Sequence, residues 1–390
     1  MPDLKNIIKN IEKIQTRLII QNNCVKRDVL KQITVENRGM LITGARGVGK
    51  TTWMLSQLSS NHFLYFSADN PIFSAFPLYD LAEAVFMEGY EGILIDEVHY
   101  SKDWAVHLKS LYDSFPNKII IASDSNSIAL KSGVSDLSRR FFTQSIPLLS
   151  FREYLMLKTK KDFPKFDPYN YDLKVIKKIM EKTNVLLAFK NYIKHGLRPF
   201  FLESEKLYST KLLNTVRKSM EADIPFIVPG FSGNHLRLMN AVIGFLAVSK
   251  IPLIQVNSLC NKWAVGKEKL YQLLDAMERA HIIRTIRKKN DTKIHSIGAK
   301  LFLHDVSVYN CFLGNYGTVR EAYVANISMD SGRDVFAAGK EKDFDFLIDS
   351  HKVEVGGKNK NIKNADFVIR DDTDIPFNNV IPLWMLGFEY

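Results

Sequence analysis

The sequence predicts an α/β fold built on a parallel sheet. Three observations predict it. Apolar segments of strand length alternate with segments of helical spacing in the first part of the chain. A Gly-x-x-x-x-Gly-Lys-Thr motif at residues 44–51 lies between the apolar residues 40–42 and the helical segment 52–58. A second apolar segment, residues 92–97, ends in two carboxylates. Alternating strands and helices favour a parallel sheet, whose ligands bind at the carboxyl ends of the strands.

The glycine-rich motif has the residue types that a nucleotide-binding loop needs. Glycines let backbone N–H groups surround phosphate oxygens, and the N-terminus of the following helix adds positive potential. Lys50 is expected to reach the β- and γ-phosphates and to assist catalysis, and Thr51 is expected to ligate Mg²⁺. The expected nucleotide-binding residues of the loop are Gly44, Ala45, Arg46, Gly47, Val48, Gly49, Lys50, Thr51 and Thr52.

The strand that ends in Asp96 and Glu97 supplies the acidic groups that such a loop requires beside it. Asp96 is expected to act on the Mg²⁺ ion, and Glu97 is expected to polarise the attacking water as the catalytic base. Glu97 distinguishes two functions, because a nucleotide-binding switch has no need of it and a hydrolase benefits from it. The alternative is a strand that ends in an acidic turn.

Two further groups are candidates for sensing or neutralising the γ-phosphate. The apolar segment 118–122 runs into polar residues, so Ser123 or Asp124 is the candidate sensor, unless this segment only forms a turn. Downstream, Arg140 follows Arg139. An arginine here could stabilise transition-state charge across a subunit or domain contact, or form a surface salt bridge.

Composition sets limits on class and partners. The chain has 390 residues, 46% hydrophobic and 24% charged, which predicts two or three globular domains. The formal charge of +11 favours polyanionic partners such as DNA or RNA, or it reflects a solvated basic surface. Cys24, Cys260 and Cys311 have no paired spacing. The first residues are polar and amphipathic and no apolar segment reaches the length of a membrane span, so no signal peptide and a cytoplasmic protein are expected.

These motifs resemble the AAA-related P-loop ATPases of bacteria and archaea that carry a winged-helix segment and a nuclease-like C-terminal domain. The similarity covers residues 43–52, 95–99, 123–127, 139–141 and 147–155. The last segment resembles the family's Pro-Leu-Ser-Phe-x-Glu-(Phe/Tyr)-Leu signature, with one extra leucine. The resemblance implies that Arg140 is the finger arginine, although Arg139 replaces the usual glycine. It also implies that the ATPase domain ends near residue 158.

The second half of the chain is divided by pattern and by this resemblance. Residues 1–158 are the expected ATPase domain, 159–234 a helical connecting region, 235–298 a winged helix-turn-helix and 299–390 a nuclease-like domain. Three helical segments precede two strand segments, 282–287 and 293–296, which flank a basic tip. In DNA readers the third helix enters the major groove. The residues expected to face DNA are Lys267, Lys269 and Gln272. The alternative is a scaffold that packs on the ATPase domain.

The C-terminal residues resemble the PD-(D/E)xK pattern of the family. Asp345 and Glu354 lie on two successive predicted strands, and Lys358 is the nearest following lysine. Carboxylates in this arrangement hold Mg²⁺ in nucleases. Gly356 occupies the position of the family's lysine. Asp345, Glu354 and Lys358 are therefore either a second metal site or part of a retained fold that only binds.

The leading hypothesis is Mg²⁺-dependent ATP hydrolysis, coupled to a C-terminal half that contacts nucleic acid or a protein partner. Two alternatives remain open. One is a metal-dependent nuclease regulated by ATP, and the other is a non-catalytic regulator whose DNA or protein binding is gated by nucleotide. The expected cofactors are ATP and Mg²⁺. Further copies of the same chain are a candidate partner, and a membrane is not expected.

Overall fold

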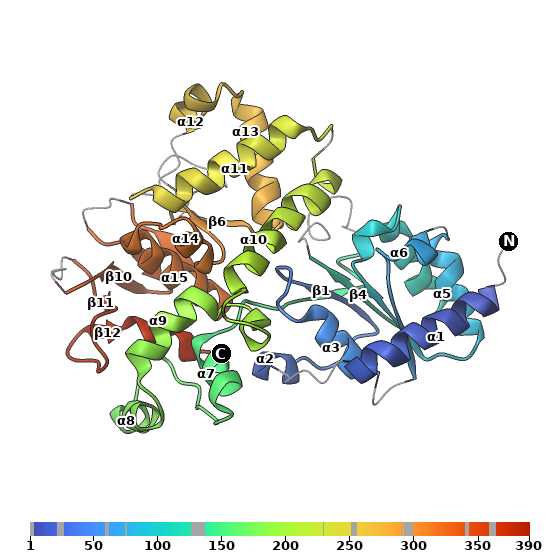
Figure 1. The fold of residues 1–390 in the computed structure, drawn as a ribbon, viewed down its shortest axis with the longest axis horizontal. Helices are drawn as coiled ribbons and strands as arrows, with labels where there is room; N and C mark the ends of the chain where they lie inside the picture. The colour runs from blue at the N-terminus through green and yellow to red at the C-terminus, as the bar shows by residue number, and fades with distance from the viewer. Residues whose placement is uncertain are drawn as a thin grey trace. The chain divides into compact units, whose positions relative to one another are not determined.

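The computed structural model divides the chain into two compact units, Met1–Pro147 and Leu148–Tyr390 (Figure 1). The predicted boundary at residue 158 lies downstream of this division. The four-part division of the chain stays a prediction. The structure describes residues 4–21, 27–58, 62–74, 76–125, 137–228, 230–250, 256–289, 291, 299–339, 343–358 and 364–390.

The first unit contains the expected parallel sheet. Its strand order is β2-β3-β4-β1-β5, and all neighbouring strands are parallel. The register places Thr43 beside Asp124, and Ser67 beside Asp96, at the carboxyl ends of the strands. The strands are β1 (Gly39–Thr43), β2 (Phe63–Ser67), β3 (Gly92–Asp96), β4 (Ile119–Asp124) and β5 (Phe142–Ser145).

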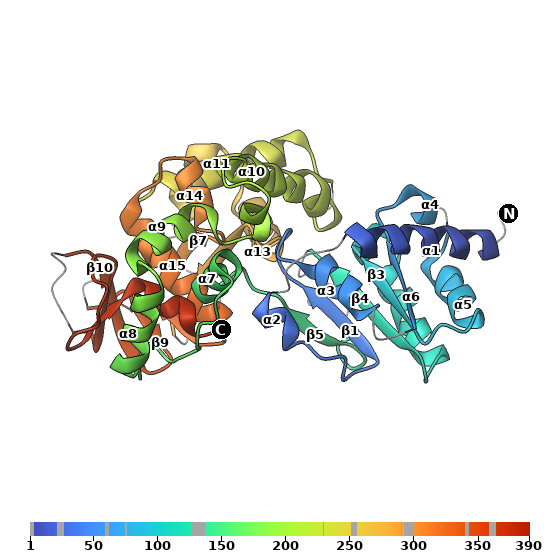
Figure 2. The same ribbon diagram turned by 60° about the horizontal axis from the view of Figure 1, so that its bottom comes forward.

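Helices of the first unit pack against this sheet, with α1 and α3 contacting β2 and α5 contacting β3 (Figure 2). The buried face of α1 carries Ile7, Ile8 and Ile11, which share one core with Leu64 and Phe66 of β2. This burial explains the helical spacing of apolar residues before the first strand. The helices are α1 (Leu4–Gln21), α2 (Asp28–Lys31), α3 (Lys50–Gln57), α4 (Pro71–Ser74), α5 (Leu78–Met87), the 3-10 helix η1 (Val98–Tyr100) and α6 (Trp104–Ser114).

The second unit begins with α7 (Phe151–Thr159), whose N-terminus is closed by a capping box between Ser150 and Glu153. The Ser150 hydroxyl and Arg152 Nε donate to the carbonyl of Tyr390 at 2.9 and 3.0 Å. These contacts explain why α7 belongs to this unit. The helices that follow are α8 (Leu173–Lys182), α9 (Val185–His195), η3 (Pro199–Leu202), α10 (Tyr208–Lys218), η4 (Ser219–Asp223) and η5 (Ile224–Phe226).

Three helices and a two-stranded antiparallel ribbon come next. They are α11 (Gly233–Val248), α12 (Val256–Trp263), α13 (Lys267–Arg279), β6 (Ile283–Ile286) and β7 (Lys300–Leu303). The predicted return strand at residues 293–296 lies outside the described residues. The strand that pairs with β6 is instead β7, with Ile283 opposite Leu303. The ribbon is followed by α14 (Ser307–Cys311).

The remaining elements form a mixed sheet of order β12-β11-β10-β9-β8. Strands β8, β9 and β10 are antiparallel, and β10, β11 and β12 are parallel. Helix α15 (Tyr316–Asp330) packs on β8 and β10. The strands are β8 (Val335–Ala337), β9 (Phe346–Ile348), β10 (His351–Gly356), β11 (Phe367–Arg370) and β12 (Val380–Pro382), and η6 (Leu383–Phe388) follows them. Within the described ranges, no helix is both long enough and apolar enough to cross a membrane.

Candidate functional site

The glycine-rich loop connects β1 to α3 with the expected strand–loop–helix geometry. Gly44, Gly47 and Gly49 have φ values of 140°, 80° and 107°, a region that glycine adopts far more readily than other residues. A Cβ atom on Gly44 would lie 2.4 Å from the carbonyl oxygen of Ile146. The shape of the loop therefore depends on its glycines.

Lys50 opens α3 and is only 6% exposed. Its Nζ donates to the carbonyl oxygens of Gly44 and Ala45 at 2.7 and 3.3 Å. Burial lowers the pKa of Lys50, although nearby carboxylates, above all Glu97 and Asp96, oppose this shift. The ammonium group is thus held inside the loop by two backbone carbonyls, which carry no net charge. A phosphate bound at the same place would stabilise the charged form of Lys50.

Asp96, at the end of β3, joins the loop to the neighbouring strands. Its Oδ2 accepts a hydrogen bond from Thr51 Oγ1 at 2.6 Å and another from the Tyr65 hydroxyl at 2.9 Å. Its Oδ1 accepts from the Ser123 hydroxyl. Burial and the Asp96 charge raise the pKa of Tyr65, so its hydroxyl remains a donor. A hydroxyl and a carboxylate oxygen side by side are ligand types that suit Mg²⁺, so Thr51 and Asp96 fit that ion.

Glu97 follows Asp96 with a left-handed backbone conformation, at φ 50° and ψ 47°. Its N–H donates to Asp96 Oδ1 at 3.1 Å and to Ser123 Oγ at 3.2 Å. Its carboxylate accepts hydrogen bonds from Arg46 Nη1 at 3.1 Å and from the Ser125 hydroxyl at 2.8 Å. Arg46, which was expected to bind nucleotide, therefore contacts the predicted catalytic base in this structure.

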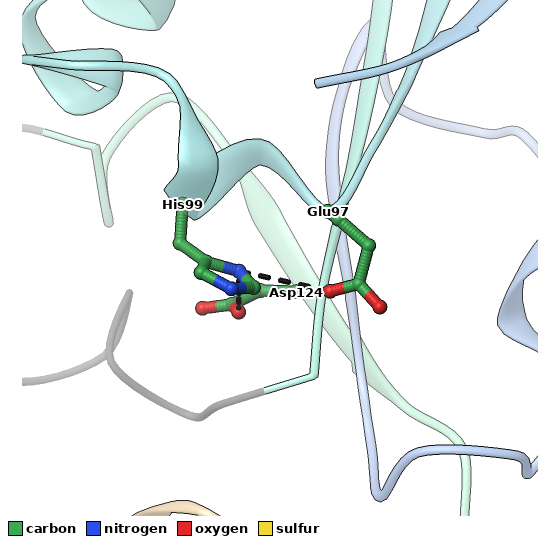
Figure 3. A group of neighbouring side chains, drawn as sticks. All are labelled: Glu97, His99 and Asp124. Carbon is green, nitrogen blue, oxygen red and sulfur yellow. Dashed lines mark ion pairs between the residues drawn. The ribbon is translucent and has the colours of Figure 1, made fainter. Parts of the chain in front are cut away.

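His99, on the 3-10 helix η1, lies beside Glu97 and Asp124 (Figure 3). Its Nδ1 is 2.9 Å from Asp124 Oδ1 and 3.7 Å from Glu97 Oε2. His99 and Asp124 are buried. One ligand atom from each of the three residues lies within 4.8 Å of the others, so this group has the spacing of a metal site.

The candidate sensors are directed at other side chains of the site. Ser123 contacts Asp96, and Asp124 contacts His99. The rest of the serine-rich segment, residues 126–127, lies outside the described residues. The assignment of Ser123 to nucleotide binding stays a prediction.

Arg140 lies away from the loop of its own unit. Its Nε and Nη2 donate to the carboxylate of Asp113 at 2.8 and 2.9 Å. A Cβ atom on Gly39, the first residue of β1, would lie 2.7 Å from the Arg140 carbonyl oxygen. Arg140 is therefore at the amino end of β1, whereas the loop follows its carboxyl end, roughly 15 Å along the strand. The catalytic role of Arg140 stays a prediction, and it requires a second chain.

Sequence patterns assigned no role in the site to Arg27, Tyr65 or His99. Arg27 is 2% exposed, and its Nη1 donates to the carbonyl oxygens of Val48 and Pro147, each at 2.8 Å. Tyr65 lies on the buried strand β2 and donates to Asp96. Arg27 and Tyr65 act through partners far along the chain, and no local pattern marks such contacts.

The second predicted site, Asp345, Glu354 and Lys358, differs from the first in the contacts of its carboxylates. Asp345 Oδ2 accepts from the backbone N–H of Val355 at 2.8 Å, and Asp345 Oδ1 lies 3.6 Å from Lys300 Nζ. The same Nζ donates to Glu321 Oε2 at 2.7 Å. Glu354 is fully buried, whereas Lys358 is exposed just beyond β10. The structure thus brings Asp345 together with Lys300, which no sequence signal indicated.

Comparisons with known proteins agree with the geometry of the first unit. Residues 36–155 match the family model of the AAA domain. An uncharacterised protein of Methanocaldococcus jannaschii is 30% identical over 308 residues, which are 71% of this chain and 64% of that protein. The chain therefore spans less than two thirds of the length of this relative.

Solved structures also match over much of the chain. A Walker-type ATPase of Pyrococcus abyssi matches with a TM-score of 0.40 and 12% identity, over 75% of this chain and 97% of that one. A variant of RuvB from Thermotoga maritima matches with a TM-score of 0.29 and 14% identity, over 77% and 94%. Both TM-scores are below 0.5. Residues 36–155 are thus similar to an AAA domain, and this similarity together with the loop geometry supports an AAA-related P-loop ATPase that binds ATP.

Proposed function

We propose that this chain binds ATP with Mg²⁺ and hydrolyses it at the edge formed by the phosphate loop and the ends of β3 and β4. One observation carries the proposal: Thr51 Oγ1 lies 2.6 Å from Asp96 Oδ2, although the two residues are 45 positions apart. This contact brings together the two oxygen ligands that a nucleotide-bound Mg²⁺ needs. Glu97 follows directly and supplies a base.

Each side chain has a role in this reaction. Lys50 exchanges the carbonyls of Gly44 and Ala45 for phosphate oxygens and neutralises their charge. Mg²⁺, when bound, neutralises charge that develops on the phosphates. Glu97 orients a water and accepts its proton. Arg46 donates a hydrogen bond to Glu97. Whether this contact is kept or broken when nucleotide binds determines whether the Glu97 carboxylate can reach the attacking water.

The test is phosphate release by the purified chain with ATP and Mg²⁺, together with saturable binding of labelled ATP. We expect Lys50→Ala to abolish turnover. Lys177→Ala, an exposed lysine on α8, is the matched control and is expected to behave as wild type. Equal phosphate release by wild type and Lys50→Ala would remove the activity from this site.

We further propose that the second unit contacts nucleic acid through a winged-helix arrangement of α11, α12, α13 and the β6–β7 ribbon. Helix α13 carries Lys267 and Gln272 exposed and Lys269 partly exposed, which supports this role. Binding to duplex DNA should fall steeply with salt. We expect Lys267→Ala to reduce the slope of log K against log salt by about 1. Salt-independent or absent binding would favour a protein partner instead.

The nuclease alternative has less support. The lysine position of the family's pattern is occupied by Gly356, and Lys358 is exposed beyond β10. Asp345 contacts the Val355 N–H and the Lys300 ammonium. We propose that this sheet is a retained fold used for binding. Intact DNA and RNA after incubation over a range of Mg²⁺ and Mn²⁺ would agree with this proposal. Cleavage that disappears in Asp345→Ala would contradict it.

Association of several chains remains part of the proposal, because only a neighbouring chain could bring Arg140 to a nucleotide. We expect turnover per chain to rise with protein concentration in wild type. Arg140→Ala should lose this rise, while its ATP binding is unchanged. Turnover that is independent of concentration and identical in both proteins would leave Arg140 as a surface ion-pair residue of Asp113.

A further inference from the structure

His99 has no part in the mechanism above, yet it is one of the most enclosed polar residues of the site. It lies on η1, two positions after the predicted base, and its ring centroid is 4.5 Å from that of Tyr100. Its Nδ1 lies within 3.7 Å of carboxylate oxygens of both Asp124 and Glu97. A buried imidazole between two carboxylates restricts where both of them can lie.

Asp124 connects this imidazole to the phosphate loop. It is the last residue of β4 and is fully buried. In the parallel register it lies beside Thr43, the last residue of the strand that leads into the loop. The position of Asp124 is therefore fixed by the pairing of β1 with β4. The Nδ1 atom of His99 approaches the carboxylates of both Asp124 and Glu97 (Figure 3).

Glu97 has a left-handed backbone conformation and contacts several segments. The turn after β3 directs the Glu97 side chain toward neighbours from three segments: Arg46 of the loop, Ser125 after β4, and His99 of η1. Arg46 belongs to the phosphate loop, so its contact with Glu97 is the one that a bound nucleotide can rearrange. Ser125, His99 and Asp124 are all buried.

We propose that His99 is a positioning residue that fixes the Glu97 carboxylate relative to Asp124, so that Asp124 anchors the base and is not the γ-phosphate sensor. This inference rests on the proposed hydrolysis of ATP and deepens it. His99 acts only through Glu97 and touches no reacting atom. Because a misplacement of about 1 Å is enough to cost a hundredfold in rate, loss of this contact acts on the chemical step and not on binding.

The same three residues have the spacing of a metal site, so the experiment must separate the two roles. The Arg46 guanidinium is 3.1 Å from Glu97 Oε1, and a cation so close to this carboxylate opposes a second positive charge and favours positioning. Calorimetric titration with Zn²⁺ distinguishes them. A positioning pair takes up no stoichiometric Zn²⁺, whereas a metal site binds one ion that His99→Ala abolishes.

The central experiment measures kcat and the ATP dissociation constant of His99→Ala in wild type and in a Glu97→Gln background. We expect kcat to fall by roughly tenfold to a hundredfold, with the dissociation constant unchanged within about threefold. In the Glu97→Gln background, His99→Ala should cause no further loss, because its effect passes through the missing carboxylate. Asp124→Asn should behave in the same way.

Control variants distinguish a loss of kcat caused by a misplaced Glu97 from one caused by misfolding. His99→Gln keeps a polar group near Glu97 and should recover part of the lost kcat. His107→Ala, a histidine of α6 in the same unit, should behave as wild type. Thermal melting and ATP binding check that each variant is folded. If His99→Ala does not fold, His99→Gln and Asp124→Asn provide the same comparison.

The outcomes are distinguishable. Wild-type turnover with an unchanged kcat in folded His99→Ala overturns this inference and leaves the proposed function intact. A further loss in the Glu97→Gln background, a large loss of ATP affinity, or stoichiometric Zn²⁺ uptake also overturns it. Wild-type turnover no greater than that of Lys50→Ala overturns the proposed function and the inference with it.

Discussion

Two buried lysines, Lys50 in the first unit and Lys300 in the second, have similar exposure but opposite surroundings. They are 6% and 3% exposed. Lys50 donates to two backbone carbonyls of its own loop. Lys300 donates to the Glu321 carboxylate, faces Asp345, and has the Phe346 ring 4.7 Å from its Nζ. One lysine is held by neutral dipoles, and the other is neutralised by full charges.

These surroundings indicate that Lys50 binds a ligand and that Lys300 stabilises the fold. Hydrogen bonds to neutral carbonyls are readily exchanged for stronger charge-assisted bonds to phosphate. An ammonium group already paired with carboxylates has no such gain available, and its removal takes away a cation that both of them contact. Polar groups of the first unit should therefore govern activity, and those of the second unit should govern stability. Four predictions test this contrast.

The largest effect is expected for Lys300→Ala. It leaves Glu321 and Asp345 without their shared cation, which should lower the free energy of unfolding by about 3–5 kcal/mol. ATP binding by the folded protein should not change. Urea denaturation followed by tryptophan fluorescence measures the loss, and Lys352→Ala, an exposed lysine of β10, is the control. A loss no greater than the control would mean that Lys300 is not a structural cation.

The next effect is expected for Glu97→Gln. The amide cannot accept a proton from water, so kcat should fall by at least about a hundredfold, or about 2.7 kcal/mol in activation free energy. Stability and ATP binding should stay near wild type, in contrast to Lys300→Ala. Phosphate release under saturating ATP measures it. Undiminished turnover would assign the base to another residue.

A pH effect is expected in the second unit. Burial, and then Arg284, hold the pKa of His304 well below its usual 6.5. Between these pKa values the unfolded chain binds a proton that the folded chain does not, so stability rises with pH in that window and is lost as pH falls below 6.5. This residue contributes at most about 1.4 kcal/mol per pH unit. We expect His304→Gln to flatten the decline measured by urea denaturation between pH 6.5 and 5; an equal decline in both proteins would contradict this.

The smallest effect is expected for Tyr65→Phe. It removes one of three hydroxyl donors to Asp96, which should cost about 1.5 kcal/mol in stability because the acceptor is charged. Asp96 Oδ2 then keeps only the Thr51 hydrogen bond, which should weaken the preference of this carboxylate for one orientation. The Mg²⁺ concentration at half-maximal turnover should therefore shift. Tyr79→Phe, in the same unit, is the control. Unchanged Mg²⁺ dependence would limit Tyr65 to a packing role.

Local patterns in the sequence predicted the parallel sheet, and the structure confirms it. The phosphate loop, the strand that ends in Asp96 and the polar end of β4 are contiguous segments, and each shows its structure within a few residues. The proximity of these segments followed from one rule, that parallel strands end at one edge. That rule needs no knowledge of side-chain packing.

The remaining contacts depend on tertiary structure. Arg27 reaches the loop across 21 residues, and Lys300 meets Asp345 from a strand that the sequence did not reveal. The predicted return strand at residues 293–296 was chosen because it follows a basic tip, but β6 pairs with Lys300–Leu303. Residues 147–155 are expected to close the ATPase domain, which stays a prediction, and no sequence pattern indicated that their capped helix contacts Tyr390. Such contacts join residues that are distant in sequence and depend on how the core packs. They therefore leave no periodic pattern in the amino-acid sequence.

The backbone of Glu97 has a cost that its neighbours must offset. A non-glycine residue at φ 50° is disfavoured by roughly 1–2 kcal/mol. Glycine would relieve this strain, but it would also remove the carboxylate that Arg46 and Ser125 contact. The strained backbone and the contacts of the base therefore depend on one another, so a substitution at residue 97 changes both at once.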